Sequence, residues 1–137
     1  MARILALDMG EKRTGIAVSD PMQISAQALT TVETPALLPF LKDYVAREPV
    51  TTIVIGDPRR TREEEPIQQL VKRTAALLKK TFPELTVTLH DERFTSRMAQ
   101  QSILQSVPSK KKRQEKGLLD RVSATIILQS FMSQPIL

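Results

Sequence analysis

The sequence predicts a single α/β domain over residues 1–137, with a mixed five-stranded sheet and helices on both of its faces. Two observations predict this class. The chain opens with short apolar strands joined by tight turns, and it continues with strand and helix patterns in alternation. Alternating patterns form β-α-β units with parallel strands, whereas the opening hairpin is antiparallel. A chain of 137 residues is long enough to bury one core, so we expect one domain.

Five segments have the residue pattern of strands, namely 3–8, 13–19, 23–32, 51–57 and 85–90. The first two flank a turn that contains Gly10, which predicts a hairpin. We expect the third segment to extend this hairpin, so that the sheet starts with three antiparallel strands. Right-handed crossovers would then make the two later strands parallel to the first. The carboxyl ends of the parallel strands should share one edge, where open α/β sheets bind ligands.

Four segments have the period of helices, at about 35–47, 67–82, 95–104 and 118–132. Thr34 followed by Pro35 predicts an N-cap and a first helical position. The last helix is apolar around most of its circumference, so it should pack deeply. Residues 105–116 are polar and basic, and we expect them to form a mobile segment.

The formal net charge of +5 is concentrated in one segment. Residues 109–121 contain six basic and two acidic side chains, so this segment carries most of the excess. Such a cluster attracts phosphate groups and predicts a nucleic-acid partner, although a solvated loop has the same composition. Seven basic residues are candidates for phosphate contacts: Lys12, Arg13, Arg93, Lys110, Lys111, Lys112 and Arg113.

Composition excludes several other kinds of protein. There are no cysteines, which excludes disulfides and thiolate metal sites. No stretch approaches the roughly 20 apolar residues that a membrane helix needs, and the N-terminus lacks the layout of a signal peptide. We therefore expect a cytoplasmic protein without a membrane partner, which exists as a monomer or a weak homodimer.

Acidic side chains end the predicted parallel strands. Asp8 ends the first of them, Asp57 the second, and Asp91 and Glu92 follow the third. Because these ends share one edge of the sheet, the carboxylates would repel one another unless a cation compensated them. Mg²⁺ and Mn²⁺ prefer such oxygen ligands, so the sequence predicts a site for one of these ions. Taken singly, each acid is more typical of a strand end or a helix cap.

Asp120 strengthens the prediction of a metal site. It lies near the start of the otherwise apolar last helix, where burial of an unpaired carboxylate is costly. Ser123 and Ala124 share its face of the helix and are small, so that part of the helix can approach the sheet closely. An acid at a helix N-terminus also suits the helix dipole, so a capping role stays open. His90, the only histidine, is more typical of a structural residue than of a general base.

Four motifs of the chain resemble those of the YqgF family, also called RuvX. They are ALDMGEKRTGIAVSD (6–20), IVIGDP (53–58), DERFTS (91–96) and LLDRVSATIILQSF (118–131), and they follow one another over essentially the whole chain. The resemblance implies a ribonuclease-H-like fold and a hydrolase that cleaves phosphodiester bonds. It implies either a nuclease that processes the 5′ end of pre-16S rRNA in ribosome biogenesis or a Holliday junction resolvase that acts on branched DNA.

The resemblance also implies that Asp8, Asp120 and an acid of the DERFTS motif hold the metal and act in catalysis. The strand period alone leaves two acids open, because Asp91 continues the apolar row of the fifth strand and Glu92 its polar row. We place the ligand at Glu92, which has the longer side chain, and keep Asp91 as a further candidate. Asp57 departs from the family, which usually has an apolar residue there. It is a candidate additional ligand, a strand-end cap or a substrate contact.

Two other functions stay open at this point. A non-catalytic module that binds nucleic acid or the ribosome would need the basic segment but not the acids. A phosphotransferase of the sugar-kinase kind would need a second domain, and the sequence contains no P-loop. Neither the fold nor a metal site distinguishes RNA from DNA, so only the resemblance favours precursor rRNA.

Overall fold

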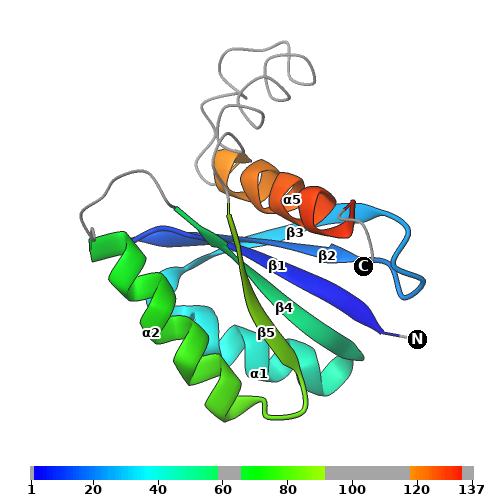
Figure 1. The fold of residues 1–137 in the computed structure, drawn as a ribbon, viewed down its shortest axis with the longest axis horizontal. Helices are drawn as coiled ribbons and strands as arrows, with labels where there is room; N and C mark the ends of the chain where they lie inside the picture. The colour runs from blue at the N-terminus through cyan, green and yellow to red at the C-terminus, as the bar shows by residue number, and fades with distance from the viewer. Residues whose placement is uncertain (1, 59–65, 92–117, 134–137) are drawn as a thin grey trace.

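A computed structural model describes residues 2–58, 66–91 and 118–133 of the chain. Their strands form one five-stranded sheet in the order β3-β2-β1-β4-β5 (Figure 1). The strands are β1 (Arg3–Met9), β2 (Arg13–Ser19), β3 (Ala26–Glu33), β4 (Val50–Asp57) and β5 (Thr86–Asp91). β1, β2 and β3 pair antiparallel, whereas β4 pairs parallel with both β1 and β5. The predicted mixed sheet is confirmed, and its three parallel strands end at one edge.

Helices cover both faces of the sheet, as predicted. α1 (Leu37–Arg47), which follows a 3₁₀ turn (Thr34–Ala36), and α2 (Pro66–Thr81) pack on one face, and α5 (Leu118–Met132) crosses the other (Figure 1). No helix among the described residues is long and apolar enough to cross a membrane. The helix predicted at 95–104 and the mobile segment predicted at 105–116 lie outside the described residues.

The pleat of each strand sends alternate side chains to two separate apolar cores. The larger core lies between the sheet and the helices α1 and α2, and it includes Leu7 of β1 and Ile55 of β4. The smaller core lies under α5 and includes Ala6, Ala17 and Val54 from three neighbouring strands. The alanines leave room for the helix, so α5 lies close to the strands.

The deep packing predicted for the last helix is confirmed. Ala124, Ile127 and Leu128 are completely buried, and Ser123 is only 4% exposed. Each fully buried large aliphatic side chain contributes about 1.5–3 kcal/mol to folding through the hydrophobic effect. The small pair Ser123 and Ala124 therefore lies in the contact with the sheet, where the sequence pattern placed it.

The prediction that Thr34 caps a helix is wrong. The 3₁₀ turn begins at Thr34 itself, and no side chain caps it. The Thr34 hydroxyl instead donates a hydrogen bond of 2.6 Å to the carbonyl oxygen of Gly10, and it lies 3.0 Å from the Thr14 hydroxyl. The backbone N–H of Thr34 donates to the carbonyl of Lys12 at 2.9 Å. Thr34 therefore ties the β1–β2 turn to the start of α1.

The third strand begins at Ala26 rather than at residue 23 as predicted. Asp20 explains the difference, because its Oδ1 accepts hydrogen bonds from the backbone N–H groups of Ser25 and Ile24, both at 2.7 Å. Gln23 has a positive φ of 58° in this turn. These bonds, led by that from Ser25, hold the pKa of the Asp20 carboxyl below its ordinary value. A turn thus occupies residues whose alternation resembled a strand.

His90 joins β5 to α5. Its Nε2 atom lies 2.8 Å from the Ser130 hydroxyl, and its ring meets the edge of the Phe131 ring with centroids 6.0 Å apart. Only 9% of the residue is exposed. This burial lowers the pKa of His90 from its ordinary value of 6.5, although Asp91 opposes the effect. The contacts favour a structural role for this side chain.

The lowered pKa of His90 predicts a pH dependence of stability. The unfolded chain takes up a proton near pH 6.5, whereas the folded chain resists protonation until a lower pH. The free energy of unfolding should therefore fall as the pH decreases from about 7 to about 5. His90→Gln should remove most of this slope. Urea unfolding at several pH values measures it, and equal slopes in the two proteins would contradict the prediction.

Candidate functional site

The first residue of the predicted metal site, Asp8, lies near the carboxyl end of β1. It follows Ile4 and Ala6 in the strand's alternation, and both of these pack in the core under α5. Asp8 therefore belongs to the face of the sheet that α5 covers. Its partner on the antiparallel neighbour β2 is Gly15, which lies on the same face.

Gly15 is the point at which the start of α5 touches the sheet. A methyl group added there would overlap the carbonyl group of Asp120 and would lie 2.9 Å from the backbone nitrogen of Arg121. Only glycine leaves room for this approach. Directly opposite residues of an antiparallel pair have Cβ positions about 4.5–5.5 Å apart. The contact therefore brings the backbone of Asp120 close to Asp8, in agreement with the approach of the helix to the sheet that the small residues Ser123 and Ala124 predicted.

Arg13 forms an ion pair with Asp120. The Arg13 Nε donates to Asp120 Oδ2 at 3.2 Å, and the two side chains are 37% and 26% exposed. One residue further along α5, Arg121 Nη1 donates to the Thr31 hydroxyl at 3.4 Å. Sequence reasoning assigned Arg13 to phosphate and did not foresee this pair. The alternation of β2 could have indicated it, because Arg13 lies on the same face of the strand as Gly15 and Ala17, which face α5.

The two further candidate ligands lie on the other face of the sheet. Asp57 follows Ile55 in β4, and Asp91 follows Leu89 in β5, and both of these apolar residues belong to the core region under α1 and α2. Asp57 and Asp91 are partners in the parallel pairing of these strands, and Asp57 is only 7% exposed. The structure thus brings Asp57 and Asp91 together, but it does not bring them to the face of Asp8.

The remaining predicted site residues divide into two groups. Lys12 is exposed in the β1–β2 turn, next to Arg13. The others lie outside the described residues, namely Glu92, Arg93, Lys110, Lys111, Lys112 and Arg113. The described part of the chain contains no group of three metal-binding side chains. Of the three predicted ligands, Asp8 and Asp120 lie among the described residues, and the role of all three as ligands stays a prediction.

The residues at Gly15 fit a divalent cation by their chemistry. Carboxylate oxygens are the ligands that hard cations such as Mg²⁺ and Mn²⁺ prefer. Asp120 already holds a positive group, the Arg13 guanidinium, at 3.2 Å. The Asp120 carboxylate thus already binds one positively charged group, the side chain of Arg13.

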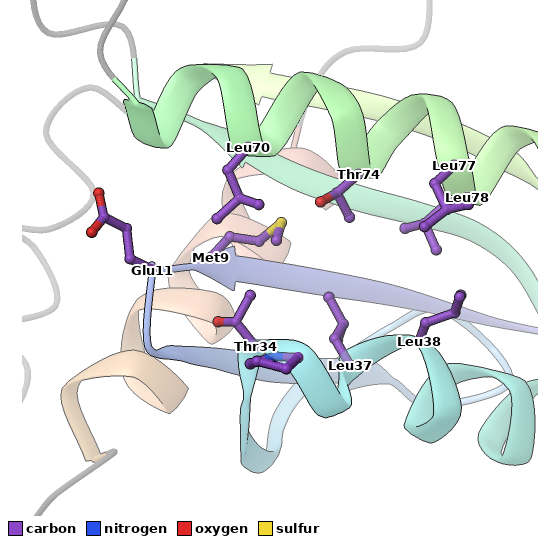
Figure 2. A pocket seen from close by; sticks show the side chains of 10 residues that line it. Met9, Glu11, Thr34, Leu37, Leu38, Leu70, Thr74, Leu77 and Leu78 are labelled. Atoms are coloured by element: carbon purple, nitrogen blue, oxygen red, sulfur yellow. The ribbon is translucent and has the colours of Figure 1, made fainter.

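An apolar pocket lies on the opposite face of the sheet, and the sequence analysis did not predict it. It encloses about 460 Å³ between α1 and α2, beside the end of β1. Figure 2 shows Leu70 and Leu77 of α2 facing Leu38 of α1 across it, with Met9 between the helices and Glu11 at the turn. Its lining offers little for a metal or a phosphate, so the pocket is separate from the site of Asp8 and Asp120.

Comparison with known proteins gives three findings. The model of the RuvX family, described as Holliday junction resolvase, matches residues 2–134. A protein of Porphyromonas gingivalis is 52% identical over 136 residues, covering 98% of this chain and 99% of its own length, and one of Flavobacterium johnsoniae is 48% identical over 134 residues, covering 97% of each. Both carry the name "Putative pre-16S rRNA nuclease".

The fold is also similar to that of a solved structure, Thermus thermophilus RuvC in complex with a Holliday junction substrate. The TM-score is 0.59 with 12% identity, and the similarity covers 97% of both chains. Identity this low shows a shared fold alone, which is the RuvC-like, ribonuclease-H-like arrangement that the motifs implied.

The contact at Gly15 generates a prediction about stability. Gly15→Ala should lower the free energy of unfolding by roughly 1–3 kcal/mol or more, because the added methyl group pushes the start of α5 away from β2. Urea unfolding measures this change. Ala28→Val, which adds bulk at an exposed position of the neighbouring strand β3, should stay within about 0.5 kcal/mol of the wild type. Equal effects of the two substitutions would show that Gly15 is not a tight contact.

Proposed function

This chain belongs to the RuvX family, and we propose on that basis that it is a divalent-metal-dependent nuclease whose substrate is the 5′ end of pre-16S rRNA. The observation that carries the proposal is the convergence of Asp8 and Asp120 across Gly15 on one face of the sheet. A nuclease of this kind needs carboxylates from separate segments at one point, and the backbone contact of Asp120 at Gly15 supports these two residues as part of such a set.

Asp8, Asp120 and Glu92 are the residues that we propose to hold Mg²⁺ or Mn²⁺. Bound there, a divalent ion would activate the attacking water and stabilise charge on the leaving oxygen of a phosphodiester. The carboxylates contribute by orienting this charge from rigid elements, since one lies on a central strand and one on the first turn of a buried helix.

The alternation of β5 supports Glu92 over its neighbour Asp91. Asp91 shares the face of Val87 and Leu89, which pack toward α1 and α2. His90 lies on the other face, where it contacts Ser130 of α5. We therefore propose Glu92 rather than Asp91 as the third ligand, because the third acid would then come from the α5 side of the sheet.

Basic residues supply the binding of the nucleic acid in this proposal. Arg13 pairs with Asp120, and Lys12 precedes Arg13 in the β1–β2 turn. Arg93 and the basic residues 110–113 are further candidates from the sequence. Contacts of this type position the phosphate backbone without reading bases, and they make the affinity depend on salt. In this proposal, basic side chains bind the nucleic acid, and hydrolysis takes place at the carboxylates.

The names of the relatives support precursor rRNA as the substrate, and with it a role in ribosome biogenesis. Cleavage of Holliday junctions is a second candidate, because the family is described by that activity and the fold is shared with RuvC. A non-catalytic module is disfavoured by the convergence of Asp8 and Asp120, which binding alone does not require.

Asp8→Asn tests the proposed chemistry. We expect metal-dependent cleavage to fall at least about 100-fold while the fold is kept, because asparagine has the same shape but lacks the charge that holds a divalent ion. The measurement is cleavage of a panel of RNA precursors, RNA hairpins and branched DNA with Mg²⁺ or Mn²⁺. Asp43→Asn, at an exposed acid of α1 that pairs with Arg47, is the matched control. Full activity of Asp8→Asn, or wild-type cleavage in excess chelator, would overturn the proposal.

A second pair of substitutions distinguishes the adjacent acids of the DERFTS motif. Glu92→Gln should abolish cleavage on the same panel, whereas Asp91→Asn should retain most of it, because Asp91 faces away from Asp8. Circular dichroism checks that both variants fold. The opposite order of activities would place the ligand at Asp91 and would show that the strand's alternation changes at its end.

A further inference from the structure

We propose that Arg13 alternates between two partners: it pairs with Asp120 in the metal-free protein, and it moves to a phosphate of the nucleic acid when a divalent ion binds. This inference rests on the proposed metal site, and it assigns to Arg13 a role that a simple phosphate contact lacks. Arg13 would compensate the negative charge of Asp120 until the metal ion and the substrate bind.

The guanidinium of Arg13 lies at one of the proposed metal ligands. Its Nε donates to Asp120 Oδ2 at 3.2 Å, so the guanidinium binds a carboxylate that we propose as a metal ligand. Arg13 is placed there by the parity of β2, since Gly15, two residues further on, touches the backbone of Asp120 itself. The pair is therefore a consequence of the same contact that brings Asp120 to Asp8.

A guanidinium and a divalent ion repel each other when both lie at one carboxylate. An arginine side chain does not lose its proton in proteins, so it relieves the repulsion only by moving away. The pair is also weak enough to open, because both side chains are partly exposed, at 37% and 26%. A divalent ion gains more from the two carboxylates than the guanidinium gains from one.

The Arg13 side chain stays close to the site after it leaves Asp120. Arg13 is anchored on β2, and its carbonyl accepts a 2.8 Å hydrogen bond from the Gly10 N–H, so its backbone stays at the edge of the sheet. A guanidinium released there carries donors whose geometry matches phosphate oxygens. Metal binding would thus expose a phosphate-binding group next to the reacting bond. By linkage, metal and nucleic acid should each raise the affinity of the site for the other.

Metal affinity separates this role from a structural tie between β2 and α5. Mn²⁺ binding to the full chain can be measured by electron paramagnetic resonance of the free ion, without any cleavage assay. Arg13→Gln should bind Mn²⁺ about two- to fivefold more tightly than the wild type, because the competing cation is gone. Lys12→Gln is the matched control, since it removes the same charge from the adjacent exposed position. It should change the affinity less than Arg13→Gln does.

A second measurement tests the release of Arg13 toward phosphate. The affinity for an RNA hairpin is measured by fluorescence anisotropy with and without Ca²⁺, an ion chosen to fill an oxygen site. The wild type should bind RNA more tightly when Ca²⁺ is present, and Arg13→Gln should lose most of this gain. Arg13→Lys, which keeps the charge, should retain part of it.

The outcomes distinguish this inference from the proposed function. Equal Mn²⁺ affinity in Arg13→Gln and the wild type, or an equal gain in Lys12→Gln, would overturn the role of Arg13. Reduced stability of Arg13→Gln with weaker Mn²⁺ binding would show a structural tie instead. If the wild type binds no Mn²⁺, or binds it equally well as Asp8→Asn, the proposed metal site itself fails.

Discussion

The contact between the start of α5 and strand β2 is the constraint on which the rest of the site depends. Gly15 admits the carbonyl group of Asp120 to a position that any side chain would fill. Because Asp8 is the cross-strand partner of Gly15, this one contact sets the relation between two acids more than a hundred residues apart in the sequence. Ala6 and Ala17 in the core beneath the helix support the same close approach. Packing of small residues therefore brings these two acids close together.

The pleat of the sheet divides the acids of this edge between two environments. Asp8 and Asp120 lie on the side of α5, whereas Asp57 and Asp91 are paired on the side of α1 and α2. Parallel strand ends share an edge, but adjacent residues of one strand face opposite ways. A metal ligand thus has to lie at a strand end and also on the correct face of the sheet, which its position in the strand's alternation sets. The apolar pocket between α1 and α2 lies on the second side, away from the face of Asp8 and Asp120.

Rigidity and charge at the site come from different residues. Thr34 fixes the β1–β2 turn by its hydrogen bond to Gly10, which holds the chain just beyond Asp8. Arg13 balances the charge of Asp120 through a pair that is partly exposed and therefore weak. A stable scaffold with a weakly held counter-charge suits the proposed site, which would bind a divalent cation together with a nucleic acid.

The order of the described elements, the mixed sheet and the edge at which the strand-end acids lie could be predicted from the sequence, because these follow from local periodicity and from the handedness of crossovers. The sequence also predicted the deep packing of the last helix and the small residues at Ser123 and Ala124 that permit it. Local patterns were misleading at Thr34 and at residues 23–25, where side chains bond to a distant or irregular backbone. The fold was needed to show that Gly15 contacts a helix and that Arg13 pairs with Asp120, because both contacts join segments that are remote in the chain.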